Sequence, residues 1–596
     1  MRLAIPLLLT LAALTAAASA AAGEPAAAER GAVRAAGEGA RGAASSPPMR
    51  RVVLLGLGTR GKLGRYVRKV SNPSSSRYRR FLKPSGFRSR FSAPPADRRR
   101  VLRFLRGQAG VRRVQLSSTR TTALAVLSPA AAQRLFCASD PGVPLSGLCI
   151  PPRLRGVVRQ VSVGEQYEAG LGPSGSSGAG REPLSANTGT PEGCAEARAT
   201  GAYLPNQLAA AYGTDRLRDR GLSGRGVRVA ILSGQPYRDP GLETWSRCFD
   251  LPEPRVESFS MPSANGTTAT VSNEQALDIQ GLASLAPGLE RIMPIFVPLD
   301  QNFSHSFPLF MFGVLDRSRQ FGRLPDVLSI SDGVCEKFFS PDQLRLGERL
   351  LREAAAFGIT ALAAAGDSGF LGCEGGGTGA SYPNSSRFVT GVGGTNLSLD
   401  AGNRIERQVV WSTFATAGTQ AVGTGGGPSA RYGRPGYQRA PGIGAELQPG
   451  DRSRLTPDLA AMASFEPGIA TFNEGQGGWG ADGGTSAATP LSAAIVALVS
   501  EQERRAGRAR LGSLPPLLYE LARGPGYGSI FFDITVGTSS RKPNSAVGQT
   551  PAAGAAQPGY DLATGLGSLN ASAFADAVAT AAPRGREPRV EEGPPE

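Results

Sequence analysis

Histidine is almost missing from this sequence, because His305 is the single one among 596 residues. A Ser-His-Asp triad could therefore be built only on this side chain, and no HGTH-like motif surrounds it. His305 lies in the loop-like stretch 302–306, so we expect it to be a surface residue. A serine nucleophile in this chain would then need a carboxylate as its base.

Several other signatures are also missing. The six cysteines form no CxxC pair, which argues against a zinc or redox motif. Beyond the first twenty residues no apolar run approaches transmembrane length, so we expect no membrane anchor. The net charge is +17, but no zinc-finger or recognition-helix pattern accompanies the basic residues, and we expect no nucleic-acid partner.

The first twenty residues have the pattern of a secretory signal peptide. Arg2 supplies the positive end, residues 5–17 form a short apolar run, and residues 18–20 are a small-residue cleavage site. We therefore expect a secreted, extracellular protein. An even number of cysteines in an exported chain predicts disulfides. The simplest pairing joins neighbours in the chain: Cys137 with Cys149, Cys194 with Cys248, and Cys335 with Cys373.

The positive charge is concentrated near the N-terminus. Residues 1–200 hold 31 Lys and Arg against 10 Asp and Glu, whereas residues 201–596 hold 34 against 38. This asymmetry predicts that the basic segment pairs with the acidic body of the same chain. If body carboxylates hold the segment in place, acid would protonate them and release it.

Composition predicts a small N-terminal domain and a linker after it. Residues 21–49 are rich in Ala, Gly and Pro, and we expect them to be disordered. Strand-like and helix-like runs are mixed between residues 50 and 149, which is typical of a small α+β domain. The strand-like runs are 51–55, 111–116 and 122–127, and the helical ones are 62–70, 96–107 and a helix after Ser128-Pro129. Residues 150–193 have linker composition and offer a processing site.

The region from 194 to 582 has a different pattern. Apolar strand-like runs alternate with helical segments, of which residues 340–357 are the clearest. The strand-like runs are 227–232, 326–331, 359–365 and 388–392. This alternation predicts a mostly parallel sheet with helices on both faces, with functional groups at the carboxyl ends of the strands. Residues 583–596, rich in Pro and charge, are expected to be a disordered tail.

Four residues have the chemistry of a peptide-cleaving site. Ser486 lies in Gly483-Gly484-Thr485-Ser486, directly before an apolar helical run, so the free N–H groups of a helix N-terminus would face an oxyanion. Glu274 and Asp278 are four residues apart on one helical face, where two carboxylates share a proton. Asp367 follows the predicted strand 359–365 and could donate a hydrogen bond if protonated. Taken alone, the Glu274 and Asp278 pair and the Asp367 turn are each more often structural than catalytic.

Together, the order Glu274, Asp278, Asp367, Ser486 on an α/β pattern resembles the sedolisin (serine-carboxyl peptidase) family. The family motif SGTSxxxP reads GGTSAATP here, so Gly483 replaces its first serine. The resemblance implies Ser486 as nucleophile, Glu274 as base, Asp278 as its proton-sharing partner and Asp367 as oxyanion donor. It also implies a subtilisin-like parallel sheet preceded by a ferredoxin-like α+β pro-domain.

The resemblance extends to other parts of the chain. Residues 71–82, followed by Phe87 and Phe91, look like a pro-kumamolisin-type pro-domain signature, and residues 202–206 and 211–213 look like the start of the mature enzyme. This implies a self-processing, acid-acting zymogen with a Ser-Glu-Asp triad. Its partners would be polypeptide substrates and its own pro-domain as inhibitor, and we expect a monomer. Endopeptidase and tripeptidyl-peptidase activity both stay open.

Two further sites are implied by the same resemblance. One structural Ca²⁺ ion would be held by five residues, through two carboxylates and three backbone carbonyls. These residues are Asp533, Ile534, Gln557, Gly559 and Asp561. The second site is the segment Ser331-Asp332-Gly333, which would pair with substrate backbone. Its middle position is often apolar or aromatic in the family, so Asp332 predicts a preference for basic or polar side chains.

Three other interpretations compete with this one. The chain could be an inactive homologue that binds peptide or a cell-surface polymer, although all four catalytic positions are filled. It could be a subtilase that uses His305. It could also be a basic nucleic-acid-binding protein, which would leave the signal peptide and the charge asymmetry unexplained.

Overall fold

The computed structural model describes eleven stretches of the chain. They are residues 50–138, 148–165, 188–261, 272–297, 303–316, 322–370, 372–373, 377–413, 422–439, 452–539 and 554–581. The predicted signal peptide, the segment 21–49 and the tail 583–596 lie outside the described residues. The chain divides into two compact units, 1–48 and 49–596, and all described residues belong to the second.

The N-terminal domain is a four-stranded antiparallel sheet with helices, as predicted. Its strand order is β2-β3-β1-β4. The strands are β1 (Arg51–Leu57), β2 (Val111–Leu116), β3 (Thr122–Leu127) and β4 (Val158–Glu165). The helices are α1 (Leu63–Ser71), α2 (Pro84–Phe91), α3 (Pro95–Arg106) and α4 (Pro129–Phe136). Ser128 caps α4 by accepting from Ala131 N at 3.3 Å.

The predicted linker 150–193 begins too early. Strand β4 lies inside it and pairs antiparallel with β1, so the N-terminal domain extends to residue 165. The alternation of Val161 and Val163, both buried, is the strand signal. Neighbouring glycine and proline residues gave this stretch the composition of a linker and concealed the signal. Residues 166–187 of the predicted linker lie outside the described part.

The main domain is built on a mostly parallel sheet, in the strand order β16-β15-β10-β8-β5-β7-β6, with β19 paired parallel to β15. Only the pairing of β15 with β16 is antiparallel. The strands are β5 (Arg228–Ser233), β6 (Phe259–Ser260), β7 (Arg291–Phe296), β8 (Val327–Ile330), β10 (Thr360–Ala364), β15 (Val389–Leu399), β16 (Ile405–Val410) and β19 (Leu459–Met462). This architecture confirms the predicted α/β fold.

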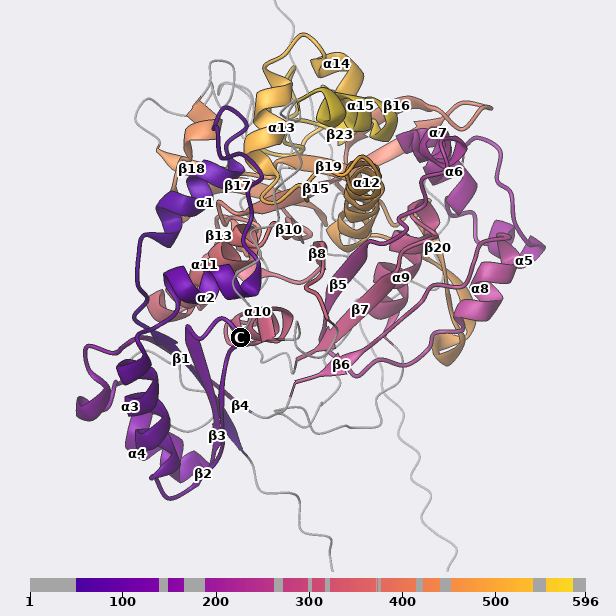
Figure 1. Ribbon diagram of the computed structural model, residues 1–596. Coiled ribbons are helices and arrows are strands. Elements are labelled where there is room, and N and C mark those ends of the chain that lie inside the picture. The colour runs from indigo at the N-terminus through magenta and orange to yellow at the C-terminus, as the bar shows by residue number, and fades with distance from the viewer. Residues whose placement is uncertain are drawn as a thin grey trace, which may run out of the picture. The chain divides into compact units, whose positions relative to one another are not determined.

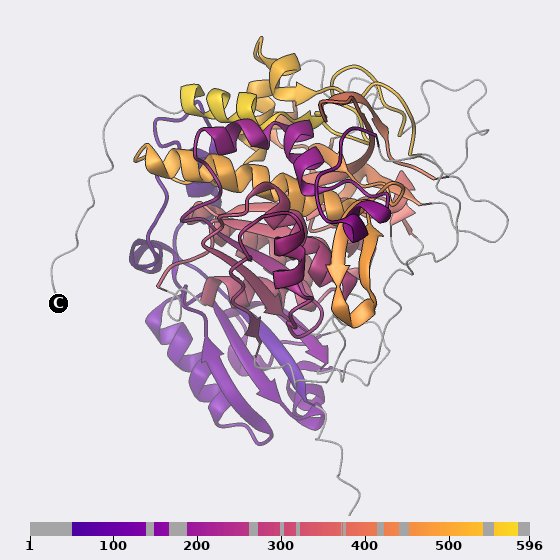
Figure 2. The same cartoon turned by 90° about the vertical axis from the view of Figure 1, so that its right-hand side faces the viewer.

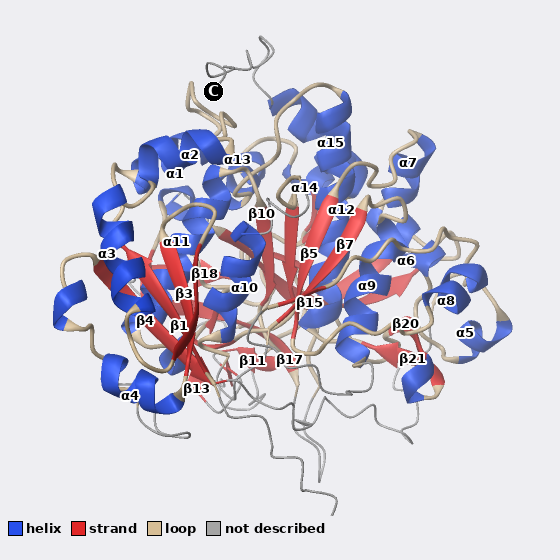
Figure 3. Cartoon of the chain, turned by 60° about the horizontal axis from the view of Figure 1, so that its bottom comes forward, coloured by secondary structure: helices blue, strands red, loops and turns tan. Residues whose placement is uncertain are grey.

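Helices cover both faces of this sheet (Figures 1 and 3). On one face, α9 (Asn273–Leu285) and α12 (Thr485–Arg505) pack with Val229 and Ile231 of β5. On the other face, α10 (Ser306–Asp316) and α11 (Pro341–Ala356) pack with Ala230 and Leu232. Successive side chains of a strand point to opposite faces of the sheet, so alternate residues of β5 pack into two different hydrophobic cores.

Shorter elements complete the main domain. The helices are α5 (Ala195–Ala199), α6 (Pro205–Tyr212), α7 (Thr214–Asp219), α8 (Leu242–Cys248), α13 (Pro515–Ala522), α14 (Tyr527–Ile530) and α15 (Ala571–Ala581). The strands are β9 (Val334–Cys335), β11 (Ser368–Phe370), β12 (Gly372–Cys373), β13 (Gly377–Thr378), β14 (Ser381–Tyr382), β17 (Gly423–Gly433), β18 (Ser453–Thr456), β20 (Ile469–Asn473), β21 (Gly478–Asp482), β22 (Phe531–Phe532) and β23 (Ser568–Leu569).

The N-terminal domain packs on the main domain through one face of its sheet (Figures 1 and 2). Val52, Leu54, Leu124 and Val126 belong to the same buried cluster as α10 and α11, whereas the opposite face of the sheet has a core of its own. Polar contacts also link the two domains. Arg79 donates to Glu503 at 2.6 Å, Leu82 N to Ala356 O at 3.0 Å, Ser118 N to Asp316 at 2.9 Å, and Arg349 to Leu57 O at 2.8 Å.

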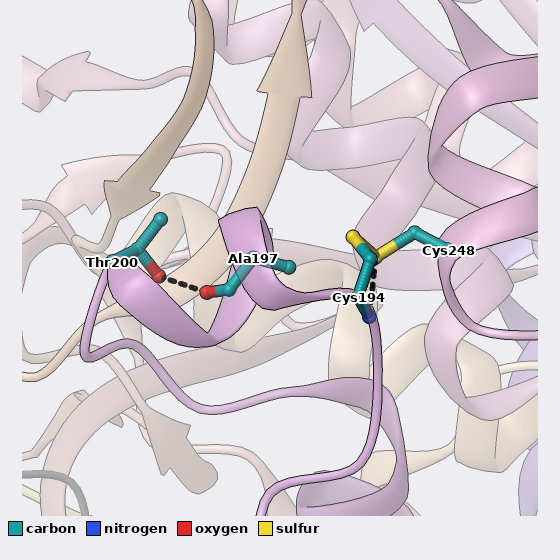
Figure 4. Close-up of a disulfide and its surroundings, with 4 residues drawn as sticks. All are labelled: Cys194, Ala197, Thr200 and Cys248. Carbon is teal, nitrogen blue, oxygen red and sulfur yellow. Dashed lines mark hydrogen bonds between the residues drawn. A yellow bond between two sulfur atoms is a disulfide. The ribbon is translucent and has the colours of Figure 1, made fainter.

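Three disulfides join the cysteines in the predicted neighbour pairing: Cys137–Cys149, Cys194–Cys248 and Cys335–Cys373. The second fastens the start of α5 to the end of α8, and Cys194 N also donates to Cys248 Sγ at 3.2 Å (Figure 4). Thr200 closes the other end of α5 by donating to Ala197 O at 2.7 Å. Among the described helices, none combines the length and apolarity needed to cross a membrane.

Candidate active site

Ser486 lies in the first turn of α12. The helix is preceded by Gly484, whose φ of +82° favours glycine. A Cβ at Gly484 would also lie 2.5 Å from Asp367 Oδ2. Ser486 Oγ donates to Ser331 O at 3.3 Å. The glycine-rich turn therefore serves two purposes, because it starts the helix and lets Asp367 approach the backbone beside the serine.

Ser331 and Asp367 come from neighbouring parallel strands. Ser331 follows β8 directly and Asp367 lies just beyond β10, and these strands pair in parallel. Both residues therefore reach the carboxyl edge of the sheet, where α/β folds place their sites. The predicted position of Asp367 at the end of a strand is the observed one.

Helix α9 brings the two remaining carboxyl groups to this edge. Ser272 caps the helix by accepting from Gln275 N at 3.2 Å. Glu274, Asp278 and Gly281 recur at spacings of four and three, so they share one face of α9. A Cβ at Gly281 would lie 3.1 Å from Pro490 Cγ, so this face packs closely against α12. The glycine and proline thus allow the close helix contact that brings Glu274 to Ser486 and Asp278 to Ser331.

Glu274 and Asp278 form a coupled acidic pair. Burial raises the pKa of Glu274 well above its usual value, and the charges of Asp278 and Asp332 raise it further. A hydrogen bond with Ser486 offsets part of that rise. Glu274 Oε1 is buried and has no hydrogen-bond partner among the described residues. A free carboxylate oxygen beside a serine hydroxyl can accept its proton.

Asp278 is held by one short hydrogen bond. Ser331 Oγ donates to Asp278 Oδ1 at 2.5 Å, and Asp278 is only 1% exposed. Burial raises the pKa of Asp278 well above its usual value, and the bond from Ser331 lowers it in part. A buried carboxyl with this environment binds a proton more tightly than one in water.

Asp367 uses one oxygen for structure and leaves the other free. Its Oδ1 accepts from Thr485 N and from Thr485 Oγ1, each at 2.8 Å. Gly366 N in turn donates to Thr485 Oγ1 at 3.0 Å. Burial raises the pKa of Asp367, and the two Thr485 donors lower it in part. With Oδ1 occupied by donors, a proton on this carboxyl group belongs on Oδ2.

A cavity of about 80 Å³ lies beside Ser486 and Asp367. Its lining also includes Thr485 and the segment 331–333, whereas Glu274 and Asp278 do not line it. Burial raises the pKa of Asp332 in this segment to about 6. Sequence reasoning had given Asp332 only a subsite role and missed its electrostatic coupling to Glu274. It also missed Thr485, whose only signal was its place inside the GTS motif.

The residues predicted to bind calcium lie together near β22. Asp533 Oδ2 accepts from Gly559 N at 2.9 Å, and its Oδ1 accepts from Tyr527 Oη at 3.1 Å. Asp561 accepts from Ala563 N at 2.8 Å and from Thr564 N at 2.7 Å, and burial raises its pKa to about 7. Within the described residues, no three acidic, His or Cys side chains gather as metal ligands. A cation here would therefore need backbone carbonyl oxygens as well.

His305 is not a surface residue, contrary to the sequence-based expectation. It is 3% exposed, and Ser162 Oγ of β4 lies 2.7 Å from its Nδ1. The N-terminal domain covers the loop-like sequence around it, which a local pattern does not reveal. Its partner is Ser162 in that domain, so His305 is no part of the Ser486 site.

The chain is similar to several known proteins. A sequence-family model described as "Pro-kumamolisin, activation domain" matches residues 40–139. Kumamolisin of Bacillus sp. (strain MN-32) is 33% identical over 385 residues, covering 63% of this chain and 64% of that protein. Sedolisin of Pseudomonas sp. (strain 101) is 26% identical over 365 residues, covering 58% and 56%.

A solved structure shares the fold. It is Pseudomonas sedolisin, a serine-carboxyl proteinase complexed with two molecules of pseudo-iodotyrostatin, with a TM-score of 0.52 and 22% identity over 64% of this chain and 98% of that chain. Fold and site together define an α/β protein in which a serine at a helix N-terminus meets buried carboxyls. The chain has a pro-kumamolisin activation domain, and its sequence is similar to those of the serine-carboxyl peptidases kumamolisin and sedolisin. The matches span less than two thirds of kumamolisin and of sedolisin.

Proposed function

We propose that the protein is a secreted, acid-acting serine-carboxyl peptidase that is made as a self-processing zymogen. The observation that carries this proposal is the buried acidic pair of Glu274, beside Ser486, and Asp278, bonded to Ser331, whereas the single histidine contacts Ser162 instead. The similarity to kumamolisin and sedolisin supports the same reaction class. Acid action follows because buried carboxyls replace imidazole as the proton carriers.

In the proposed mechanism, Ser486 Oγ attacks the carbonyl carbon of the scissile peptide bond and transfers its proton to Glu274. Asp278 shares that proton, since two coupled carboxyls hold one proton more readily than none or two. Glu274 then gives the proton to the leaving amine, and the C–N bond breaks to leave an ester on Ser486. Water, deprotonated by Glu274, attacks this ester and releases the second product.

The oxyanion of each tetrahedral intermediate would accept a hydrogen bond from protonated Asp367. The free oxygen Oδ2 is the donor, because Oδ1 is already occupied by Thr485. The raised pKa of Asp367 favours the protonated form in mildly acidic water. A donor aimed at the developing charge contributes most when it is fixed in advance, as the Thr485 contacts require.

The N-terminal domain is the proposed pro-domain, extending from 50 to 165. The peptidase domain extends from 194 to 582, and processing would take place in the segment between them. Export by the signal peptide 1–20 would place the enzyme outside the cell. Its partners would be polypeptide substrates, which the segment 331–333 would bind by backbone pairing, with Asp332 favouring basic or polar side chains nearby.

One Ca²⁺ ion is proposed to stabilise the segment after β22. Asp533 and Asp561 would supply carboxylate oxygens, and Ile534, Gln557 and Gly559 would supply backbone carbonyls, an all-oxygen set that suits this cation. The raised pKa of Asp561 supports a cation, because a buried carboxylate without a positive neighbour is costly. The ion would have no part in the chemical steps.

The direct test compares the wild type with Ser486→Ala on denatured casein between pH 3 and 8. We expect activity in mildly acidic solution that falls by at least about 10⁴-fold in the variant. Activity that survives in Ser486→Ala, or that is lost in His305→Ala but kept in Glu274→Gln, would overturn the proposal. Peptides with a blocked N-terminus separate the two kinds of peptidase, because a tripeptidyl-peptidase requires a free amine.

A further inference from the structure

The only histidine of the chain is buried at the contact between the two domains. His305 directly precedes α10, and its imidazole meets Ser162 of β4 through Nδ1 at 2.7 Å. Its other ring nitrogen, Nε2, is buried and has no hydrogen-bond partner in the part of the chain that the structure describes. The imidazole therefore fits the contact in its neutral form, with one polar atom satisfied.

Strand β4 passes directly over the imidazole ring. A Cβ at Gly164 would collide with His305 Cδ2, so only glycine allows this approach. Ser162 and Gly164 lie opposite Leu54 and Val52 of β1, whose side chains belong to the cluster shared with α10 and α11. The histidine thus sits beneath the last strand of the pro-domain, directly before the segment proposed for processing.

No described acid accompanies the imidazole to compensate a positive charge. On α11, Asp342 accepts from Val161 N at 3.3 Å and pairs with Arg345, and Arg349 reaches Leu57 O while it pairs with Glu353 at 3.8 Å. At the far end of α10, Asp316 accepts from Ser118 N. The N-terminus of α10 also disfavours a cation beside it.

We propose that His305 is the acid-sensitive contact that holds the pro-domain on the peptidase domain. A proton on Nε2 would be buried without an acceptor. Burying an uncompensated charge is costly, and this cost is comparable to the free energy that keeps a packed strand in place. Protonation therefore favours the state in which β4 leaves the imidazole and water surrounds it. This inference uses the proposed zymogen function only for its consequence, which is the timing of processing.

The sign of the effect follows from linkage. Burial lowers the pKa of His305 to about 3 in the docked state, against its ordinary value of 6.5. A group whose pKa is depressed in the docked state stabilises docking above 6.5, and this stability is lost as pH falls from 6.5 towards 3. Near pH 4.5 one such proton weakens docking about 100-fold relative to neutral pH.

The interface carboxylate Glu353 acts in the opposite direction. The pKa of Glu353 is raised, because burial outweighs the charge of Arg349 and the nearby hydroxyls of Thr121 and Thr119 of the pro-domain. A raised carboxyl pKa favours docking in acid, so Glu353 resists release. The sequence predicted that acid would release the pro-domain by protonating carboxylates that pair with its arginines. Among the described contacts, one buried pair of this kind is present, between Arg79 and Glu503.

The experiment uses the full chain with Ser486→Ala, which cannot process itself. Hydrogen exchange of the β4 amides, corrected for intrinsic rates, is measured from pH 7 to about pH 4.5 in this parent and with His305→Gln added. We expect the parent to lose protection about 100-fold and the glutamine variant to lose much less. Equal losses in both proteins would overturn the proposal. His305→Asn provides a second neutral replacement if glutamine disturbs folding.

Two further measurements make the test specific. Ser162→Ala keeps the imidazole, so it should weaken docking at every pH and retain the step between pH 7 and 4.5. Because the chain has one histidine, its labelled ring signal reports its own titration, and a pKa near 6.5 in the docked parent would refute the proposal. These readouts need no peptidase activity, so they test the histidine contact alone. The proposed function is tested separately, because proteins that retain Ser486 but never process themselves would count against it.

Discussion

Asp367 and Thr485 are joined by two hydrogen bonds that end on the same carboxylate oxygen, Oδ1. The backbone N–H and the hydroxyl of one threonine thereby orient the carboxyl group and leave Oδ2 free, and Asp367 itself lines the cavity beside Ser486. In this arrangement Oδ1 of Asp367 holds the carboxyl group in place, and Oδ2 is available to donate to the oxyanion. It also makes the role of Asp367 testable, because an asparagine side chain can donate a hydrogen bond but does not change its charge with pH.

Asp367→Ala should lower kcat by about 10²–10³-fold, the usual cost of losing one oxyanion donor. Asp367→Asn should retain part of the activity, because its amide can donate to the oxyanion without titrating. The wild type loses activity as pH rises through the raised pKa of Asp367, since the carboxyl then ceases to donate. The alkaline limb of the kcat/KM profile should therefore change in the asparagine variant. An unaltered limb would contradict the donor role.

Glu274→Gln should remove the base and lower kcat by about 10²–10⁴-fold. The same change should raise Tm at neutral pH, because the pKa of Glu274 is raised on folding. A carboxyl with a raised pKa stabilises the fold in acid, and this stability is lost as pH rises. The Tm difference between the variant and the wild type should therefore grow from pH 3 to pH 7.

Glu243→Gln on α8 is the matched control for that experiment. Glu243 is a glutamate in a helix too, but its side chain is 77% exposed and lies 3.7 Å from Arg247. An exposed ion pair of this kind contributes little to stability. This control should leave kcat and the pH dependence of Tm unchanged. A control that behaves like Glu274→Gln would show that helix charge, and not the acidic pair, sets the profile.

Local sequence patterns predicted a mostly parallel sheet and the strands β5, β8, β10 and β15, but not β6, β7, β16 or β19. The strand 360–364 and the helix 341–356 follow from apolar runs, a Ser-Pro start and a glycine end. Glu274 and Asp278 could be placed on one helical face from their spacing alone. Their depth could not be predicted, because it depends on the contact of Gly281 with Pro490, which lies 209 residues further along the chain.

The contacts between domains were outside the reach of local patterns. Strand β4 was hidden by its glycine and proline neighbours, and His305 is covered by that strand. The role of Thr485 was likewise set by a partner distant in sequence, Asp367. These failures have one cause, since each feature is created by packing between segments and not by the propensity of either segment.

Gly484→Ala should abolish activity and lower stability. The residue would have to adopt φ +82°, and its Cβ would press on Asp367 Oδ2 at 2.5 Å. The expected cost is about 1–3 kcal/mol from backbone strain, with displacement of Asp367 as the reason for lost activity. Gly480→Ala in β21 is the control, because nothing lies within 4 Å of its added Cβ. Denaturant unfolding and peptidase assays together check both effects, and full activity in the Gly484 variant would contradict the geometry.

Removal of calcium should lower the stability of the segment after β22. An ion that binds only the folded state contributes about 2.7 kcal/mol when its free concentration is a hundred times Kd. Chelation should therefore lower Tm, and added Ca²⁺ should restore it. Asp561→Asn should abolish this response, because it removes a carboxylate from the proposed ligand set. The exposed Asp576, which pairs with Arg220 at 2.7 Å, provides the control as Asp576→Asn. A Tm that ignores chelation in the wild type would refute the calcium proposal and leave the acidic pair at Ser486 unaffected.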